Sequence, residues 1–587
     1  MSQAINQSNG LGGGRGRQTW LLALTLLALV GLAGRVAYWQ TAQAATLAAR
    51  ANAEHLRAIP FAAARGLILD ANGNILAVSV TRAMVIADPD VIRQNGALDG
   101  DAQALGQALG LAAGLVRGQL AVAGAYVALA DPTSQAGAPL LLTEGQRVAV
   151  NAAIASGALV GVALYPVVLR EYPDGPLAAQ TLGFVQSTSG LGQYGVEQEE
   201  NGMLAGQPGL LYTAVDANGD PLATMPQRLT PAVAGADVTL TLDANIQYWA
   251  EQGLAQTIAA TGADGGSVIA LDPRTGAILA MANAPSFDPN VYGQASLSAL
   301  ANPAISAIYD PGSTMKAVTM AAGVQTGVIT PNSTLYDPGY TVVDGVTIYN
   351  FDHQGHGEET MTQALQYSAN VGAAWVAQRV GQSRFDATLA AFGFGAPTGV
   401  DLPGETAGLL AQSASPAEAA LTLAENAFGE SIGVTPLQLV MAYAALANGG
   451  LLLRPYVVAS VALNGGQGAS VANGPHIVRR VISAATAQTV TQMLVDSALV
   501  SEAQMSLVSG YSVAAKTGTA TPDPANPGLT YASVVGYAPA SQPRVVLLVK
   551  LDHPRSTIFG GEAAGPLWRA LIAQILRYYR VAPDKAQ

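Results

Sequence analysis

The 587-residue sequence contains no cysteine, and charged residues are scarce. Without thiols, the protein has no disulfide, no thiolate metal site and no cysteine nucleophile. Asp, Glu, Lys and Arg together make up 11% of the chain, the net charge is -12, and no basic run exceeds Arg479-Arg480. This composition argues against nucleic acid as a partner. Hydrophobic residues, by contrast, make up 50% of the chain, which is ample for large cores.

Lysine is also scarce. Four lysines occur, at positions 316, 516, 550 and 585, against 23 arginines. Arginine does not lose its proton in a protein, so lysine is expected to persist where a neutral amine is needed. Drift of GC-rich codons from lysine to arginine would explain the scarcity. It would not explain why two of the four lie in the short motifs described below.

One long hydrophobic segment lies near the N-terminus. Residues 20–34 are uncharged, and residues 36–39 extend the apolar stretch beyond Arg35, whose long side chain can reach the membrane surface. A helix that crosses a membrane needs about 20 such residues. We therefore expect a single transmembrane helix over residues 19–39.

The flanks of this segment predict its orientation. Arg15 and Arg17 precede it, so residues 1–18 are expected to form a cytoplasmic tail and everything after residue 40 to lie outside the cytoplasm. The alternative is a cleaved signal peptide, because Ala42-Gln43-Ala44 matches a small-x-small cleavage site. Retention is favoured because the apolar segment is long and the site lies well past its end.

Beyond the membrane segment the pattern predicts two modules. Residues 40–235 begin with a helix continuing to about residue 58, include a helical insertion over 95–165, and end in a linker over 228–237. We expect them to form an elongated α+β pedestal. Residues 236–587 run from strands to helices and back to strands, which is typical of an antiparallel sheet flanked by helices. The expected fold class is therefore α/β (α+β), with strands at 266–271, 277–281, 512–519, 531–537 and 544–551, a helix between Thr435-Pro436 and Asn448-Gly449, and a closing helix at about 563–579.

The stretch Pro311-Gly312-Ser313-Thr314-Met315-Lys316 carries the clearest chemistry. Pro-Gly is a helix start signal before an apolar run, so Ser313 and Lys316 are expected side by side on the first turn of a buried helix. A hydroxyl becomes a nucleophile when a base takes its proton, and a desolvated lysine near a helix N-terminus has a lowered pKa. Ser313 is thus a candidate acylation site. The alternative is a simple helix cap.

Two further motifs follow in order, Ser368-Ala369-Asn370 and Lys516-Thr517-Gly518. Each of these patterns, like Ser-x-x-Lys, occurs once in the chain, and they are separated by 55 and then 148 residues. Alone, Asn370 could cap a helix and Lys516 could be a charge at a strand edge. Together, the ordered motifs indicate serine acyl-enzyme chemistry.

The three motifs resemble those of class B penicillin-binding proteins, the monofunctional DD-transpeptidases of bacterial cell walls. Ala369 departs from the better-known Ser-Asp-Asn form. The resemblance extends from the membrane segment onward and includes Tyr309-Asp310, Arg65-Gly66 with Asp70 and Asn72-Gly73, Tyr194-Gly195-Val196-Glu197, Thr435-Pro436-Leu437-Gln438 and Phe559-Gly560-Gly561. It implies a penicillin-binding transpeptidase domain over residues 236–587.

The resemblance also implies a role for each helical motif residue. Ser313 would attack the penultimate carbonyl of a D-Ala-D-Ala stem peptide, and Lys316 would take its proton. Ser368 would relay a proton to the leaving D-alanine; simple positioning of Lys316 is the alternative for Ser368. Asn370 would hydrogen-bond the amide backbone of the donor peptide.

The late motif would bind the other end of the donor. Lys516 would supply positive potential, and the hydroxyls of Thr517 and Thr519 would hold the terminal carboxylate. Gly518 would let the strand backbone approach the substrate. The backbone N-H groups of Ser313 and Thr519 would form the oxyanion hole.

No metal and no cofactor are expected. His353-Gln354-Gly355-His356 invites a metal interpretation, but it lies in a Gly-rich acidic loop of a cysteine-free chain with five histidines in all, so a structural or substrate-edge loop is favoured. Asp352, Glu358 and Glu359 are expected to be solvated.

The resemblance implies peptidoglycan stem peptides as substrates, β-lactams as covalent inhibitors, and a SEDS-family membrane glycan polymerase as partner at the cytoplasmic membrane. A membrane-anchored serine β-lactamase or a β-lactam sensor shares the same motifs and is the alternative function; a catalytically silent scaffold is a third. The sequence leaves open whether the protein serves elongation or septation, and which amine is the acceptor.

Overall fold

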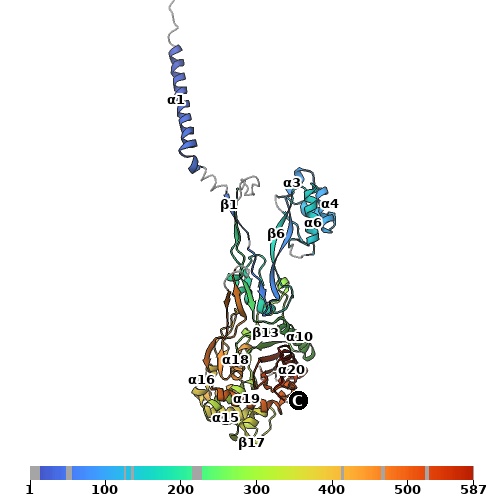
Figure 1. The fold of residues 1–587 in the computed structure, drawn as a ribbon, viewed down its shortest axis with the longest axis vertical. Coiled ribbons are helices and arrows are strands. Elements are labelled where there is room, and N and C mark those ends of the chain that lie inside the picture. Colours follow the sequence, from blue (N-terminus) through green and yellow to red (C-terminus); the bar gives the residue numbers. More distant parts are fainter. Residues whose placement is uncertain are drawn as a thin grey trace, which may run out of the picture. The chain divides into compact units, whose positions relative to one another are not determined.

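The computed structural model describes residues 14–47, 56–61, 63–124, 127–133, 138–214, 228–410, 416–463, 470–521, 526 and 528–585. The chain forms two compact units (Figure 1). The first comprises Met1–Ala63 and Gln207–Val233, and the second comprises Ala64–Gly206 and Ala234–Gln587. The two units are described separately below.

The first unit contains the N-terminal helix α1 (Gly14–Thr41). Its apolar side chains are exposed, and residues Gly16–Thr41 are long and apolar enough to cross a membrane. An apolar helix is therefore present where the membrane helix was predicted, and it is a few residues longer than expected at each end.

The same unit holds a three-stranded antiparallel sheet in the order β1 (Leu56–Phe61), β9 (Gly209–Ala214) and β10 (Arg228–Thr230). Two expectations were wrong here. The helix predicted to continue to residue 58 gives way to β1 at Leu56, and residues 48–55 lie outside the described residues. The linker predicted over 228–237 begins with β10, because pairing with β9 satisfies its backbone.

In the second unit, β2 (Ile68–Leu69) and β3 (Ile75–Ala87) form the hairpin predicted around Asn72-Gly73. The Asp70 carboxylate accepts hydrogen bonds from the backbone N-H of Asn72 and Asn74, both at 2.8 Å, so it is a turn residue as expected. Strand β3 pairs along its length with β6 (Val162–Glu171). The insertion predicted over 95–165 contains α4 (Leu98–Leu109), α5 (Ala113–Leu120) and α6 (Glu144–Ala155), and α3 (Pro89–Gln94) precedes it. The four helices lie between β3 and β6 in the chain and share their own core.

A five-stranded antiparallel sheet forms the centre of the second unit. Its order is β13 (Ile278–Ala284), β12 (Gly265–Leu271), β26 (Val545–Asp552), β25 (Tyr531–Ala538) and β24 (Ala514–Ala520). These are the five strands predicted from the sequence, displaced by at most two or three residues. The fold class is confirmed.

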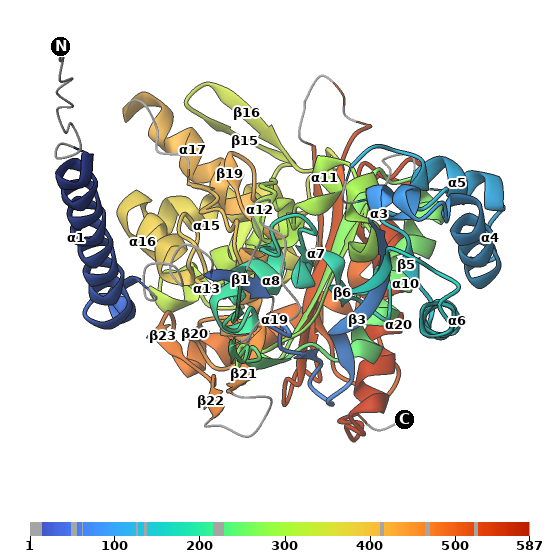
Figure 2. The ribbon, with the colours of Figure 1, turned by 90° about the horizontal axis from the view of Figure 1, so that it is seen from above.

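Alternating side chains of this sheet enter two different cores. In β26, Val546 and Leu548 pack into a core with the helices α13, α18 and α19, whereas Leu547 and Val549 pack into a second core with α10 and α20. Figure 2 shows α10 and α20 on one side of the sheet and α13 and α15 on the other. These helices are α10 (Ala244–Thr261), α13 (Lys316–Gln325), α15 (Asn370–Val380), α18 (Pro436–Ala447), α19 (Ala484–Ala498) and α20 (Gly560–Tyr578).

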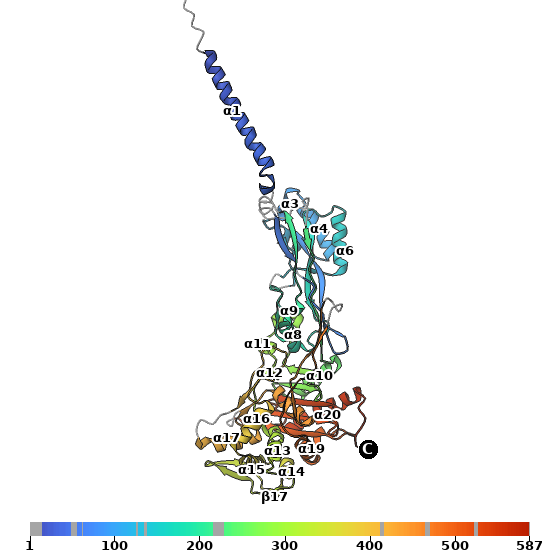
Figure 3. The ribbon, with the colours of Figure 1, turned by 60° about the vertical axis from the view of Figure 1, so that its left-hand side comes forward.

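The fully buried α18 fixes the turn that precedes α13. Thr435 caps α18 in a reciprocal capping box with Gln438, as the Thr-Pro start signal predicted. Farther along, the Tyr443 hydroxyl donates to the carbonyl of Thr314 at 2.8 Å. Figure 3 shows α13, α15 and α19 close together with α14 (Met361–Gln366). The position of Ser313 is thus set by a packed helical cluster.

Candidate active site

Ser313 lies in a short 3₁₀ turn, Gly312–Met315, directly before α13. The sequence placed Ser313 in the first turn of one continuous helix; in the structure this turn is a separate 3₁₀ turn, which begins at Gly312 with a positive φ of 56°, a conformation that glycine adopts readily. The Gly312 N-H donates to the carbonyl of Gly429 at 3.0 Å. Ser313 and Lys316 remain three residues apart and adjacent, as predicted.

Lys316 is fully buried and its amine is surrounded by the other motif residues. Its Nζ lies 2.9 Å from Ser313 Oγ, 3.3 Å from Ser368 Oγ and 2.7 Å from Asn370 Oδ1, and it also contacts the carbonyl of Ser368. Burial lowers the pKa of Lys316 well below its usual 10.5, and the charge of Lys516 lowers it further. Such a lysine can hold its amine in the neutral form near pH 7.

Ser368 lies in the turn between α14 and α15 and has a positive φ of 56°, an uncommon conformation for a serine. This backbone directs its hydroxyl to Ser313, with 2.9 Å between the two Oγ atoms. Asn370, the first residue of α15, donates from Nδ2 to the carbonyl of Tyr349 at 2.9 Å. Ser313, Lys316, Ser368 and Asn370 therefore form one connected cluster, here called the helix side.

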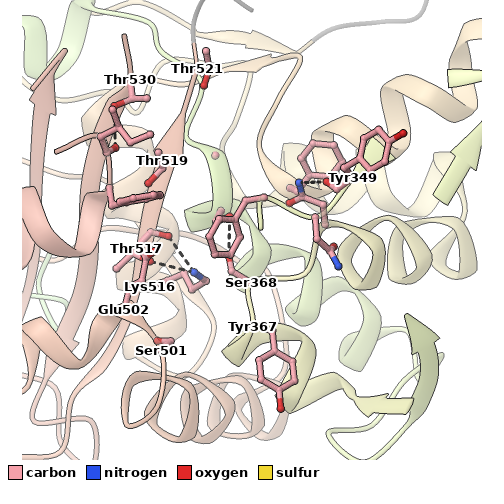
Figure 4. Close-up of a pocket in the computed structure, with 18 of the residues that line it drawn as sticks. Tyr349, Tyr367, Ser368, Ser501, Glu502, Lys516, Thr517, Thr519, Thr521 and Thr530 are labelled. Atoms are coloured by element: carbon pink, nitrogen blue, oxygen red, sulfur yellow. Dashed lines mark hydrogen bonds between the residues drawn. The ribbon is translucent and has the colours of Figure 1, made fainter. Parts of the chain in front are cut away.

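Lys516, Thr517 and Thr519 lie on the edge strand β24 and are called the strand side. Figure 4 shows them following one another along the strand, with Ser368 facing them. Lys516 is 1% exposed, and among the described residues its Nζ forms hydrogen bonds with the next residue alone, at 3.2 Å from the Thr517 carbonyl and 3.4 Å from its hydroxyl. Burial lowers the pKa of Lys516 to about 8, against the opposing effect of Glu502, so Lys516 remains mostly protonated at neutral pH.

Gly518 packs against protein atoms. A side chain there would place its Cβ 2.7 Å from Ser533 Oγ and 2.8 Å from the carbonyl of Pro311. Its absence lets β24 lie directly against the turn that carries Ser313. Gly560, at the start of α20, is similarly close-packed, because a Cβ there would clash with the Gly518 carbonyl oxygen. Its N-H donates to the Thr519 hydroxyl at 3.0 Å.

The helix side and the strand side line one cavity of about 450 Å³. Ser313, Ser368, Asn370, Lys516, Thr517 and Thr519 contribute to its wall; Lys316 lies buried beneath, and Gly518 faces away from it. Sequence reasoning missed several other lining residues: Tyr349, Phe351, Phe428, Glu430, Glu502 and Phe559. Tyr349 ends strand β16 (Val346–Tyr349), and the others come from loops, a 3₁₀ turn and helix ends with no periodic signal. Phe559 belongs to the Phe559-Gly560-Gly561 stretch singled out from the sequence, and Phe351 lies just before the His353 loop.

The His353 loop is a rim of this cavity. His353 lines the cavity, and His356 stacks on Tyr367 with the ring centroids 4.4 Å apart. Within the described part of the chain, no group of three or more His, Cys, Asp or Glu side chains is arranged to hold a metal ion.

The prediction that Glu359 is solvated was wrong. Strand β17 (Gly357–Thr360) pairs with β14 (Thr334–Asp337), and alternation turns Glu359 to the same buried side as its partner Leu335. Glu359 is 1% exposed, and neither carboxyl oxygen has a hydrogen-bond partner among the described residues. Glu358, the preceding residue, is exposed as predicted.

Comparison with known families agrees with this geometry. Residues 266–573 match the penicillin binding protein transpeptidase domain, and residues 60–240 match the penicillin-binding protein dimerisation domain. The chain belongs to the class B penicillin-binding proteins. This class B penicillin-binding protein is 32% identical to the probable peptidoglycan D,D-transpeptidase PbpC of Pseudomonas aeruginosa, over 97% of this chain and 96% of the relative. It is 31% identical to the peptidoglycan D,D-transpeptidase FtsI of Escherichia coli, over 96% and 93%.

Solved penicillin-binding proteins share the fold. Penicillin binding protein 2X of Streptococcus thermophilus aligns with a TM-score of 0.77 at 23% identity, over 89% of this chain and 80% of that chain. Penicillin binding protein 3 of Mycobacterium tuberculosis, solved in complex with aztreonam, aligns with a TM-score of 0.66 at 28% identity, over 90% and 98%.

Proposed function

We propose that this class B penicillin-binding protein is a peptidoglycan D,D-transpeptidase in which Ser313 is the nucleophile and Lys316 its base. The observation that carries the proposal is the Lys316 amine, buried and 2.9 Å from Ser313 Oγ. The PbpC and FtsI relatives, with peptidoglycan D,D-transpeptidase in their names, support the same activity.

Acylation follows from the contacts. Lys316 takes the proton of Ser313 Oγ, which attacks the carbonyl between the two terminal D-alanines of a stem peptide. The resulting oxyanion is stabilised by the N-H groups of Ser313 and Thr519, a type of donor pair whose loss costs about a hundredfold or more in rate. The C-N bond then breaks, and the leaving D-alanine nitrogen receives a proton through Ser368, whose hydroxyl lies 2.9 Å from Ser313 Oγ.

Substrate binding is assigned to the remaining motif residues. Lys516, with the hydroxyls of Thr517 and Thr519, binds the terminal carboxylate of the donor. Asn370 binds the donor's amide backbone; its Oδ1 and Nδ2 are held by Lys316 and by the Tyr349 carbonyl, so its orientation is preset. Gly518 lets β24 lie close enough to the Ser313 turn for both sides to reach one substrate.

Deacylation completes the reaction. An amine of a second stem peptide attacks the ester carbonyl, the new C-N bond forms, and the C-Oγ bond to Ser313 breaks. Ser313 Oγ recovers its proton through Lys316 and Ser368. β-Lactams acylate the same serine, and aztreonam is bound by the Mycobacterium tuberculosis protein of the same fold.

The N-terminal part is assigned to anchoring and coupling. Helix α1 is a retained single-pass anchor, with the tail of residues 1–18 in the cytoplasm and the domains of residues 40–235 and 236–587 outside it. The apolar length of α1 supports retention. N-terminal sequencing of the mature protein tests it; a start at Ala45 would contradict it.

The proposed partner is a SEDS-family membrane glycan polymerase, contacted by α1 and the N-terminal module. An anchor in the same membrane and the match of residues 60–240 to a dimerisation domain support an interaction role for this part. Site-specific crosslinking from α1 in cells, followed by identification of the crosslinked membrane protein, tests the pairing.

Labelling with a fluorescent penicillin tests the proposed activity against its alternatives. A transpeptidase is acylated and stays labelled for hours. A β-lactamase turns the label over, and a silent scaffold stays unlabelled. Incubation of unlabelled protein with a peptide donor and stem peptides carrying a free amine then separates a transpeptidase from a sensor, because only the former produces cross-linked product.

A further inference from the structure

One carboxylate in the cavity has no part in the proposed mechanism. Besides His353, the acidic and basic side chains of the described cavity lining are Lys516, Glu502 and Glu430. Glu502 interacts electrostatically with Lys516, so its charge is matched by the strand side. Glu430 is exposed to the cavity, and its carboxylate makes no hydrogen bond or salt bridge with any described residue.

The backbone around Glu430 is held next to the nucleophile. The Gly429 carbonyl accepts from the Gly312 N-H at 3.0 Å, and a Cβ at Gly429 would lie 2.1 Å from the Gly312 carbonyl oxygen. Glu430 itself donates its N-H to the Glu425 carbonyl at 3.0 Å. The backbone of Glu430 is therefore fixed directly after Gly429, the residue that contacts the turn carrying Ser313.

The charged groups around Glu430 come from three elements. Burial, Glu425 on α17 (Pro416–Phe428) and Asp310 before the Ser313 turn raise the pKa of Glu430, and Lys316 on α13 opposes them by favouring the ionised form. The amine of Lys316 is already occupied by the helix side, so it is no direct partner for Glu430. A positive group arriving through the cavity is the complement that the carboxylate lacks.

We propose that Glu430 binds an aliphatic ammonium group of a stem peptide and thereby makes this site selective for cationic substrates. The inference rests on the proposed transpeptidase function and adds a specificity residue to it. Together with Lys516, Glu430 would give the cavity one site for the substrate carboxylate and one for its ammonium group.

Two sources supply such a group. One is the diamino-acid side chain of the donor peptide. The other is the acceptor, which arrives as an ammonium ion and must lose a proton before its nitrogen attacks the acyl-ester. In that case the first proton passes to the Glu430 carboxylate and then to water; the second, released as the C-N bond forms, returns to Ser313 Oγ through Lys316 and Ser368.

The donor arm of the test uses two β-lactams that differ by one amino group. Ampicillin carries an α-ammonium group that benzylpenicillin lacks, and at about pH 6 that group is protonated. We expect the ratio of acylation rates, ampicillin over benzylpenicillin, to fall about fivefold in Glu430→Gln. Glu430→Asp should recover part of the ratio. Glu418→Gln, an equal charge change at the exposed start of α17, is the matched control and should leave it unchanged.

The acceptor arm measures what fraction of the acyl-enzyme reacts with the acceptor amine and what fraction is hydrolysed by water. The donor is N-benzoyl-D-alanyl thioglycolate, and the acceptor is the tetrapeptide L-Ala-γ-D-Glu-L-Lys-D-Ala. If the acceptor is the source, Glu430→Gln lowers the ratio of aminolysis to hydrolysis about fivefold while the ratio of the two penicillins is unchanged. Melting temperatures confirm that all three variants fold. A change in neither arm overturns the inference, whereas failure of the wild-type protein to be acylated by either penicillin overturns the proposed function instead.

Discussion

The helix side and the strand side each present a buried lysine to the same cavity, and the two lysines differ in their neighbours. Lys316 is surrounded by two hydroxyls, an amide oxygen and a carbonyl, and one of the hydroxyls belongs to the nucleophile. Within the part of the chain that the structure describes, Lys516 forms hydrogen bonds with its neighbour Thr517 alone, and it interacts electrostatically with Glu502. The surroundings of Lys316 suit proton transfer, whereas those of Lys516 suit a fixed positive charge.

Electrostatics supports the same division. The pKa of Lys316 is lowered well below its usual value by burial and by Lys516, whereas the pKa of Lys516 is lowered to about 8 by burial alone and opposed by Glu502. The positive charge on the strand side therefore helps to keep the base on the helix side neutral. Two similar residues at one site acquire two roles because one has a proton-transfer partner within reach and the other does not.

Removing the nucleophile should have the largest effect, because both sides act through it. Ser313→Ala is expected to leave a folded protein that takes up no penicillin. Among the described hydroxyls, that of Ser313 lies closest to Lys316 Nζ, at 2.9 Å. Intact mass after incubation with benzylpenicillin measures this. Stoichiometric covalent labelling of the variant would contradict the assignment of Ser313.

A smaller effect should follow from removing the proposed proton relay on the helix side. Ser368→Ala removes the hydroxyl 2.9 Å from Ser313 Oγ but keeps Lys316 in place, so the acylation rate should fall about a hundredfold and not to zero. Stopped-flow acylation measures the change, with Ser298→Ala, an exposed serine outside the cavity, as control. An unchanged rate would reduce Ser368 to a positioning role for Lys316.

The smallest effect concerns stability and comes from Glu359, whose charge acts on Lys316. Burial and Asp337 raise the pKa of Glu359 from 4.5 to about 8, against the opposing effect of Lys316. Between these pH values the unfolded chain releases a proton that the folded protein keeps, so the free energy of unfolding should fall as pH rises from about 4.5 to about 8. Glu359→Gln should flatten this slope and stabilise the protein at pH 8 by about 1–3 kcal/mol.

Thermal melting across this pH range provides the measurement. Glu358→Gln makes the same change one residue earlier, at an exposed position, and should leave the slope as it is in the wild type. If Glu358→Gln and Glu359→Gln behave alike, the buried carboxyl is not the cause of the pH dependence.

The sequence predicted the site where the chemistry depends on fixed spacing. Ser313 and Lys316 lie one helical turn apart, so their contact follows from local geometry. The meeting of Ser368 and Lys516 with them was inferred from motif order and family resemblance, and the structure brings them to one cavity. The five strands of the central sheet were predictable because each is a short apolar run bounded by turn residues.

What could not be predicted depends on how separate segments pack. Glu359 looked solvated because it lies in an acidic, Gly-rich stretch, and its burial follows only from the pairing of β17 with β14. Glu430 enters the cavity because Gly429 contacts Gly312, more than a hundred residues earlier in the chain. The 3₁₀ turn at Ser313 begins at the same contact between Gly312 and Gly429, so the local sequence did not predict it.

The division of labour between the two lysines is tested most directly by replacing each with arginine, which keeps the positive charge but cannot give up a proton. The measurement is the second-order rate of benzylpenicillin acylation, with folding of each variant checked by thermal melting. Lys316→Arg should lose at least about a thousandfold, and Lys516→Arg only about ten- to hundredfold, because a fixed charge is retained there. Equal loss in the two variants, or a Lys316→Arg variant that is the more active, would contradict a titrating lysine on the helix side and a charged one on the strand side.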